Sequence, residues 1–374
     1  FLHFFDGFRT SHEIQKIETW AKEDVEKMAD MDAIKAFRDR AINPEHPVLR
    51  GTAQNPDIFF QAREACNEYY NKLPAVVEEY MDKVNKEIGT DYKLFNYYGA
   101  PDAEHIIIAM GSVNDTIEET IDYLNSKGGK FGLVKVRLYR PFCADKLIEA
   151  IPDSVKQISV LDRTKEPGAL GEPLYLDVIA ALKGSKFDAV TISSGRYGLG
   201  SKDTTPAQVK AVYWNASFKD DYKAKFTIGI NDDVTFLSLS SAEKLDTAPA
   251  GTTACKFWGL GADGTVGANK NSIKIIGDHT NKYAQAYFAY DSKKSGGVTV
   301  SHLRFGDVPI KSTYLINMAD FVACHNEAYV TKYDMVSDIK PGGTFLLNCQ
   351  WDAKELDKHL PGQTKKHIAE NNIK

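Results

Sequence analysis

The stretch CKFWGLGADGTVGANKNSIKIIG, residues 255–277, joins a short apolar run, closely spaced glycines and a second apolar run. The run 257–260 predicts a buried strand, and the isoleucines within 273–276 predict the apolar side of a helix. Glycine lets the backbone approach an anion closely, and the free N–H groups of a helix N-terminus point towards that anion. The stretch therefore predicts a strand, a glycine-rich turn and a helix that can together bind a phosphate.

A second glycine-flanked turn follows the next predicted strand, 283–290, and it carries Asp291, Lys293 and Lys294. An acidic residue at this place is typical of a dinucleotide site, where it binds a ribose hydroxyl. The two lysines favour phosphate groups instead. We therefore expect a phosphate-bearing ligand between 261–267 and 291–297, with a polar helix start at 269–274 beside it. The alternative is that the glycine turn only packs a helix against a strand.

Strand-like and helix-like runs alternate on both sides of this stretch. Strands are expected at 105–110, 133–139, 157–162, 187–193, 234–239, 298–305, 313–316, 321–324 and 344–348. Helices are expected at 116–124, 144–150, 174–182, from 205 onward, at 330–339 and within 352–372. Such alternation predicts parallel sheets that are covered by helices on both faces.

The N-terminal part has a different pattern. Residues 1–5 predict a buried strand, and Thr10 or Ser11 can cap a helix whose apolar side includes Ile14 and Ile17. Residues 60–88 predict a pair of amphipathic helices around Pro74, followed by a connector over 92–102. Because the chain opens inside a strand and without methionine, we expect an internal piece of a longer polypeptide.

Composition excludes several classes of protein. The 374 residues carry a net charge of −5 with acids and bases intermixed, whereas general nucleic-acid binding needs a basic face. No apolar run approaches the length of a membrane span. The five cysteines are scattered, which fits reduced thiols in a cytoplasm and argues against an iron–sulfur cluster within this stretch.

Other site chemistries find little support in the sequence. His302, Cys324 and His325 lie on neighbouring predicted strands, but a zinc site needs three or four converging ligands. A nucleophilic serine would be expected in a G-x-S-x-G turn, and the sequence contains none. We therefore expect neither a metal site nor catalytic residues in this chain.

Long motifs along the whole chain resemble the pyruvate:ferredoxin (flavodoxin) oxidoreductase family. They are FFDGFRTSHE, KVRLYRPF, LDRTKEPGALGEPLYLDV, SSGRYGLGSKDTTP, the 255–277 stretch, DSKKSGGVTVSHLRFGDVPIKSTYL and ADFVACHN. The resemblance implies an α/β fold with two doubly wound, mostly parallel sheet domains after the mainly helical end of another α/β domain. Residues 1–94 would end the thiamine-dependent first domain, 95–250 would be a transketolase C-terminal-like domain, and 251–374 would be part of a Rossmann-like coenzyme A domain.

The resemblance also implies a function and a site. The family decarboxylates pyruvate on thiamine diphosphate, passes electrons through iron–sulfur clusters to ferredoxin or flavodoxin, and forms acetyl-CoA. Its coenzyme A phosphate site corresponds to Gly261, Ala262, Asp263, Gly264, Thr265 and Val266, together with Asp291, Lys293 and Lys294. Thiamine diphosphate, Mg²⁺ and the clusters would be bound outside this chain, by the rest of a polypeptide that is homodimeric at full length, so the chain alone would be inactive. A non-catalytic assembly module and a paralogue for another 2-oxoacid are the alternatives.

Overall fold

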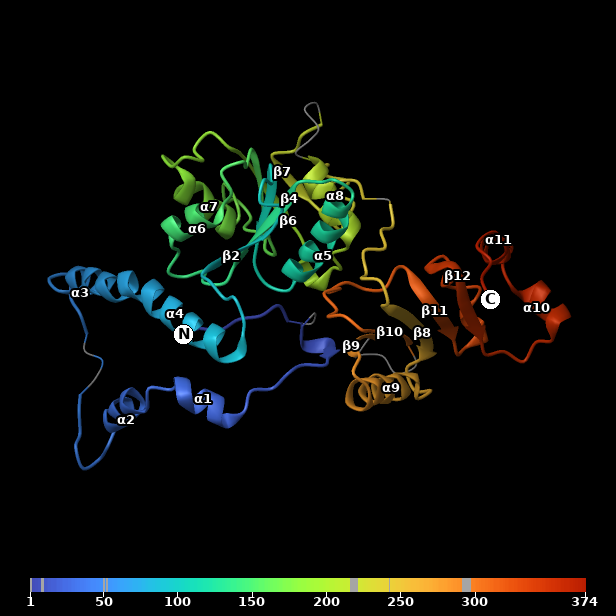
Figure 1. Cartoon of the computed structure of the whole chain (residues 1–374), viewed down its shortest axis with the longest axis horizontal. Coiled ribbons are helices and arrows are strands. Elements are labelled where there is room, and N and C mark those ends of the chain that lie inside the picture. Colours follow the sequence, from blue (N-terminus) through green and yellow to red (C-terminus); the bar gives the residue numbers. More distant parts are fainter. Residues whose placement is uncertain are drawn as a thin grey trace.

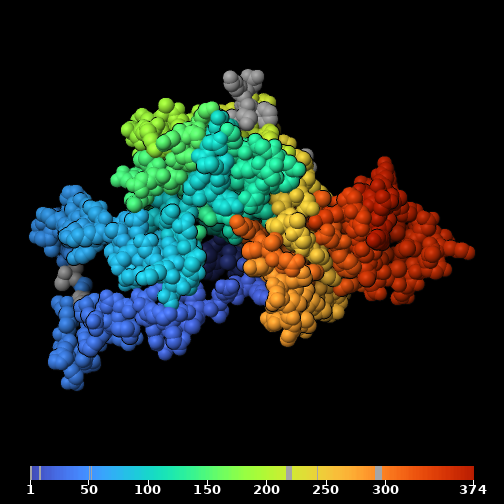
Figure 2. Space-filling view, viewed as in Figure 1, coloured from blue at the N-terminus to red at the C-terminus, as the bar shows by residue number. Residues whose placement is uncertain are grey.

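The computed structural model describes residues 2–7, 10–49, 51, 53–215, 221–241, 243–290 and 297–374. Figure 1 shows three parts in chain order: a helical N-terminal arm in blue, a middle unit in green and a C-terminal unit in orange and red. Each of the two later parts is built on a six-stranded sheet. In Figure 2 the arm extends along one side of the molecule.

The N-terminal arm holds short elements and one long helix. They are η1 (Thr10–His12), β1 (Glu13–Gln15), α1 (Lys22–Met28), α2 (Met31–Asp39), α3 (Phe59–Ala65) and α4 (Asn67–Ile88). None of the four α-helices buries a residue. The expected helix break at Pro74 is wrong, because the break comes at Cys66 and α4 continues through Pro74.

Two further expectations for the arm are wrong. Residues 2–5 form no strand and are exposed, and they pair with none of the described strands. The predicted helix over Ile14 is instead β1, which pairs antiparallel with β9 and packs Ile14 against a core of the C-terminal unit. Tertiary pairing overrides the helical spacing of the apolar residues here.

The middle unit is a sheet with helices on both faces. Its elements are β2 (Phe95–Gly99), β3 (His105–Ala109), α5 (Val113–Ser126), β4 (Phe131–Val136), α6 (Ala144–Ala150), β5 (Gln157–Asp162), α7 (Pro173–Leu182), β6 (Thr191–Arg196), η2 (Leu199–Ser201), α8 (Pro206–Asn215) and β7 (Lys225–Thr227). The strand order is β2-β4-β3-β5-β6-β7, and only β2 runs antiparallel. Helices α6 and α7 cover one core, and α5 and α8 cover the other. The expected mostly parallel, doubly covered sheet is confirmed for this unit, although β2 lies where a connector is predicted.

The C-terminal unit has a mixed sheet. Its elements are β8 (Thr253–Leu260), α9 (Thr265–His279), β9 (Tyr283–Tyr290), β10 (Val298–Gly306), β11 (Ala319–Cys324), η3 (Glu327–Tyr329), β12 (Ile339–Leu347), α10 (Ala353–His359) and α11 (Gly362–Glu370). The order is β1-β9-β10-β8-β11-β12, and only β8, β11 and β12 run parallel to one another.

The expected mostly parallel sheet is therefore wrong for the C-terminal unit. The reason is visible in the connection from β9 to β10. It spans only residues 291–297, whereas a parallel crossover needs about a dozen residues or more. A connection this short joins antiparallel neighbours, and β9 and β10 pair in this way. On its other side β10 pairs antiparallel with β8.

Three smaller expectations for residues 230–340 are also wrong. Residues 330–339 form turns that pack Met335 and Val336 into a core, and no helix. Residues 313–316 form no strand. The predicted strand 234–239 is a loop held by the Asp232 carboxylate, which accepts the amide N–H groups of Val234, Thr235 and Leu237. A side chain that satisfies backbone groups in this way competes with strand pairing.

A buried polar network joins the two sheet units. The Glu119 carboxylate on α5 accepts hydrogen bonds from the hydroxyls of Thr247, Ser312 and Tyr314, at 2.6, 2.6 and 2.7 Å. Burial, and then the Glu119 charge, raise the pKa of Tyr314 well above its usual range. The network fixes the C-terminal unit against α5. None of the helices in the described ranges is long and apolar enough to span a membrane.

Candidate functional site

The glycine turn lies between β8 and α9, as the sequence predicts. Gly264 has φ of +87°, a left-handed conformation that favours glycine, and a Cβ there would meet open space. At Gly259 a Cβ would lie 2.4 Å from the Thr265 hydroxyl oxygen, so only glycine allows α9 to start this close to β8. The two glycines have different roles: one shapes the turn and the other permits close packing.

Half of the predicted turn amides are bound by the protein itself. The amide of Gly261 donates to the Gly297 carbonyl at 2.8 Å, that of Asp263 to the Leu260 carbonyl at 3.0 Å, and that of Thr265 to the Asp263 carboxylate at 2.8 Å. The amides of Ala262, Gly264 and Val266 have no hydrogen bond to the described residues. Within the described residues, the turn therefore leaves three donors at the N-terminus of α9 without an acceptor.

The Asp263 carboxylate is the main electrostatic feature of the turn. Its two oxygens accept the amides of Leu260 and Thr265. Burial raises the pKa of Asp263, but the hydrogen bonds from Thr265 and Leu260 outweigh burial and leave that pKa below its ordinary value. A negative charge thus already lies at the start of α9, where the helix dipole favours an anion. An incoming phosphate has to bind beside this carboxylate.

His325 is a member of this site that the sequence reasoning did not assign to it. It follows β11, which runs parallel to β8, and its backbone amide donates to the Trp258 carbonyl at 2.9 Å. Its Nδ1 lies 2.8 Å from the Thr265 hydroxyl oxygen. The run ADFVACHN carried the signal, because side chains that follow neighbouring parallel strands meet at one edge of a sheet. His302 lies elsewhere, buried on β10, where its Nδ1 accepts the amide of Ile316.

The helix behind the turn has one polar side chain without a partner. Asn269 is 5% exposed, lies one turn after Thr265, and its Nδ2 has no acceptor among the described residues. Lys270 is near the Phe288 ring, with 5.4 Å between the ammonium nitrogen and the ring centroid. The remaining predicted residues, Asp291, Lys293 and Lys294, lie outside the described residues.

Three family models match the chain in succession. Residues 1–82 match "Pyruvate flavodoxin/ferredoxin oxidoreductase, thiamine diP-bdg", residues 103–209 match "Pyruvate:ferredoxin oxidoreductase core domain II", and residues 254–374 match "Pyruvate ferredoxin/flavodoxin oxidoreductase". The pyruvate-flavodoxin oxidoreductase of Enterobacter agglomerans is 59% identical over 374 residues, which are 100% of this chain and 32% of that protein. The chain belongs to the pyruvate:ferredoxin/flavodoxin oxidoreductase family.

Other members of this oxidoreductase family match over the same extent. The pyruvate:ferredoxin oxidoreductase of Moorella thermoacetica is 59% identical, again over 100% of this chain and 32% of that protein. The pyruvate dehydrogenase [NADP(+)] of Cryptosporidium parvum is 50% identical over 379 residues, 100% of this chain and 20% of that protein. The chain thus spans about a third of the length of the first two relatives and a fifth of the third. The domain boundaries near 94 and 250 fall between the matched ranges and stay predictions.

Proposed function

We propose that this chain supplies the coenzyme A-binding part of a pyruvate:ferredoxin/flavodoxin oxidoreductase. The whole enzyme would convert pyruvate and coenzyme A to acetyl-CoA and CO₂ and pass the released electron pair to ferredoxin or flavodoxin in the cytoplasm. The observation that carries the proposal is the 59% identity to named pyruvate oxidoreductases along all 374 residues. Three carriers, flavodoxin, ferredoxin and NADP, are named among such relatives, so this stretch does not determine the carrier.

The coenzyme A assignment is supported by the geometry at the N-terminus of α9. The open amides of Ala262, Gly264 and Val266 are donors of the kind that bind phosphate oxygens. Lys293 and Lys294 would add positive charge from the following turn. The role of this part would be to position the thiol of coenzyme A for acyl transfer, since a held reactant replaces a bimolecular encounter.

Thiamine diphosphate, when bound, supplies the chemistry that removes CO₂ from the 2-oxoacid. The described residues of the arm do not fit a complete site for it, because α1–α4 bury no residue. We therefore propose that thiamine diphosphate, its Mg²⁺ and the iron–sulfur clusters are bound by parts of the homodimeric enzyme outside this chain.

Substitutions at the two turns test the proposed coenzyme A site in the full-length enzyme. Lys293→Ala together with Lys294→Ala should raise the KM for coenzyme A about tenfold, as expected from the loss of roughly 1.4 kcal/mol of phosphate binding. Gly264→Val should abolish saturable binding, because its side chain enters the open turn and its backbone disfavours φ of +87°. Pyruvate decarboxylation without coenzyme A should be unchanged in both.

The control is Lys366→Ala on the exposed side of α11. If both turn variants bind coenzyme A like the wild type, the glycine turn serves only to pack α9 on β8, and the chain acts as an assembly module. If decarboxylation falls in parallel with coenzyme A binding, the positioning role is wrong.

A further inference from the structure

A second site candidate lies in the middle unit, far from the glycine turn along the chain. An open cavity of about 1070 Å³ lies where the parallel strands β4, β3, β5 and β6 end. The chain leaves β3 for β4 on one side and returns to β5 on the other, so β3 is the place where the strand order reverses. Ligands of open α/β sheets bind in the crevice outside such strand ends.

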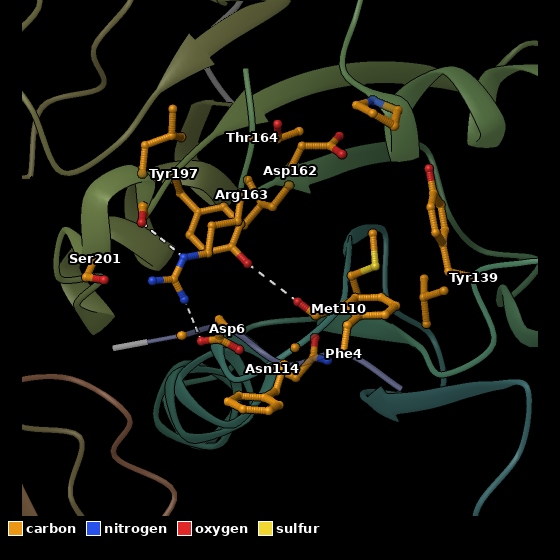
Figure 3. Close-up of a pocket in the computed structure, with 18 of the residues that line it drawn as sticks. Phe4, Asp6, Met110, Asn114, Tyr139, Asp162, Arg163, Thr164, Tyr197 and Ser201 are labelled. Carbon is orange, nitrogen blue, oxygen red and sulfur yellow. Dashed lines mark hydrogen bonds and ion pairs between the residues drawn. The ribbon is translucent and has the colours of Figure 1, made fainter. Parts of the chain in front are cut away.

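The N-terminal segment 2–7 forms the outer wall of this cavity. Its Asp6 carboxylate makes an ion pair with Arg163 after β5 and accepts the Ser112 hydroxyl and amide at the start of α5. Figure 3 shows Asp6 and Arg163 facing each other across this junction, and the Arg163 Nε also donates to the Gly198 carbonyl at 3.0 Å. These contacts of Asp6 neutralise the Arg163 charge and hold the apolar side chains of segment 2–7 at the edge of the cavity.

One buried polar atom at this cavity has no hydrogen-bond partner among the described residues. Asn114, in the first turn of α5, is 8% exposed, and its Oδ1 is buried without a hydrogen bond among the described residues. Figure 3 shows Asn114 on the same side of the cavity as Asp6. Because an unpaired buried amide costs free energy, such a group indicates a missing partner. A donor group of a ligand that reaches the Asn114 Oδ1 would satisfy it.

The remaining lining combines aromatic rings with uncompensated positive charge. Phe4 and Tyr139 supply aromatic rings to the lining, and the Arg140 guanidinium carbon lies 4.0 Å from the Tyr139 ring centroid. The Asp162 carboxylate is already used by the amides of Leu174 and Tyr175. By contrast, Lys165 and Arg137 have no carboxylate partner in the part of the chain that the structure describes, although the Arg137 Nε donates to the Asn96 Oδ1 at 2.7 Å and its guanidinium carbon lies 4.6 Å from the Tyr92 ring centroid. They follow β5 and β4, on the two sides of β3, and their positive charge in the cavity lining favours an anionic ligand over a neutral one.

We infer that this cavity binds an adenine mononucleotide. The base would stack on the aromatic wall, an N–H of its edge would donate to the Asn114 Oδ1, and its phosphate would lie towards Lys165 and Arg137. This site shares no residue with the proposed coenzyme A site. It makes the middle unit a ligand-binding part of the enzyme as well as a structural one.

Isothermal titration of the full-length enzyme with AMP tests this inference. AMP should bind, while adenosine and ribose 5-phosphate, which lack the charge or the ring, should each bind at least tenfold more weakly. Asn114→Leu should weaken AMP binding at least tenfold without lowering the melting temperature, since it removes an unpaired buried amide. Lys165→Met, an exposed position that folding does not need, should weaken binding about fivefold, and Lys183→Met, at the residue after α7, should not change it.

Two controls separate this site from the coenzyme A turn. Gly264→Val should leave AMP binding intact, and saturating coenzyme A should not displace AMP. The inference is overturned if AMP fails to bind at millimolar concentration, if coenzyme A displaces it, or if Asn114→Leu and Lys165→Met both bind like the wild type. None of these results would bear on whether coenzyme A binds at the glycine turn.

Discussion

Asp162 is a carboxylate that the fold buries at the end of β5. It is 3% exposed, and burial raises its pKa to about 6, although the amides of Leu174 and Tyr175 counteract the rise. A folded-state pKa above the ordinary 3.8 means that the folded protein holds the proton more tightly than the unfolded chain. The resulting stability is present below pH 4 and is lost as the pH rises through 6.

Asp162→Asn should remove this pH dependence. Between pH 4 and pH 7 the free energy of unfolding of the wild type should fall relative to that of Asp162→Asn by roughly 3 kcal/mol, from 1.36 kcal/mol per pKa unit. Urea unfolding at intervals across this range measures it. Asp188→Asn is the control, since Asp188 is exposed and Lys183 lowers its pKa. A wild-type curve that stays parallel to that of Asp162→Asn would show that Asp162 titrates normally.

The local structure around the glycine turn could be predicted where it depends on residues that are close together in the sequence. The strand, glycine turn and helix of 255–277 form as expected, because glycine spacing and apolar periodicity are local properties. That Asp263 would occupy the turn with its own carboxylate was not predicted, and neither was the Thr265–His325 contact. The Thr265–His325 contact depends on β8 and β11 becoming neighbours in the sheet, and no local sequence pattern specifies that pairing.

At the scale of elements, α4 shows how context overrides a helix-breaking residue. Pro74 lies inside this 22-residue helix, where it lacks the N–H that would bond to the carbonyl four residues earlier. The helix persists because it is long and ends at Gly89, whose left-handed conformation closes the last turn on the Asn85 carbonyl at 2.9 Å.

Pro74→Ala should therefore stabilise α4 by about 1–3 kcal/mol, since alanine restores the hydrogen bond and removes the ring clash. Hydrogen exchange of the α4 amides in the full-length enzyme measures this as slower exchange on both sides of residue 74. Ala75→Gly, the matched change at the next position, should accelerate exchange. Unchanged exchange in Pro74→Ala would mean that contacts outside the helix determine its stability.

At the scale of the whole molecule, Glu119 is a central contact between the two sheet units, beside the Lys311–Glu118 ion pair. Glu119→Leu should destabilise this junction by roughly 3 kcal/mol, because the hydroxyls of Thr247, Ser312 and Tyr314 lose their common acceptor while staying buried. Urea unfolding and limited proteolysis of the 240–252 connection measure the loss.

Removing the hydroxyls together with the carboxylate should restore most of that stability. Thr247→Val, Ser312→Ala and Tyr314→Phe in the Glu119→Leu background leave no unpaired donor, and replacing both partners is close to neutral. Glu149→Gln, on the exposed side of α6, is the control. If the hydroxyl substitutions do not restore stability, the free energy lost in Glu119→Leu comes from altered packing and not from unpaired hydrogen-bond donors.

The sequence by itself determined the family, the alternating strands and helices of the middle unit, and the strand–turn–helix at 255–277. These follow from periodicity and turn chemistry, which act between residues a few positions apart. Only the tertiary structure decided that β1 joins the far edge of the C-terminal sheet, that Asp6 reaches Arg163 157 residues away, and that the Asn114 Oδ1 is buried without a hydrogen-bond partner among the described residues. Such contacts depend on which distant backbone groups and charges remain to be satisfied once the local elements have formed, and adjacent residues do not carry that information.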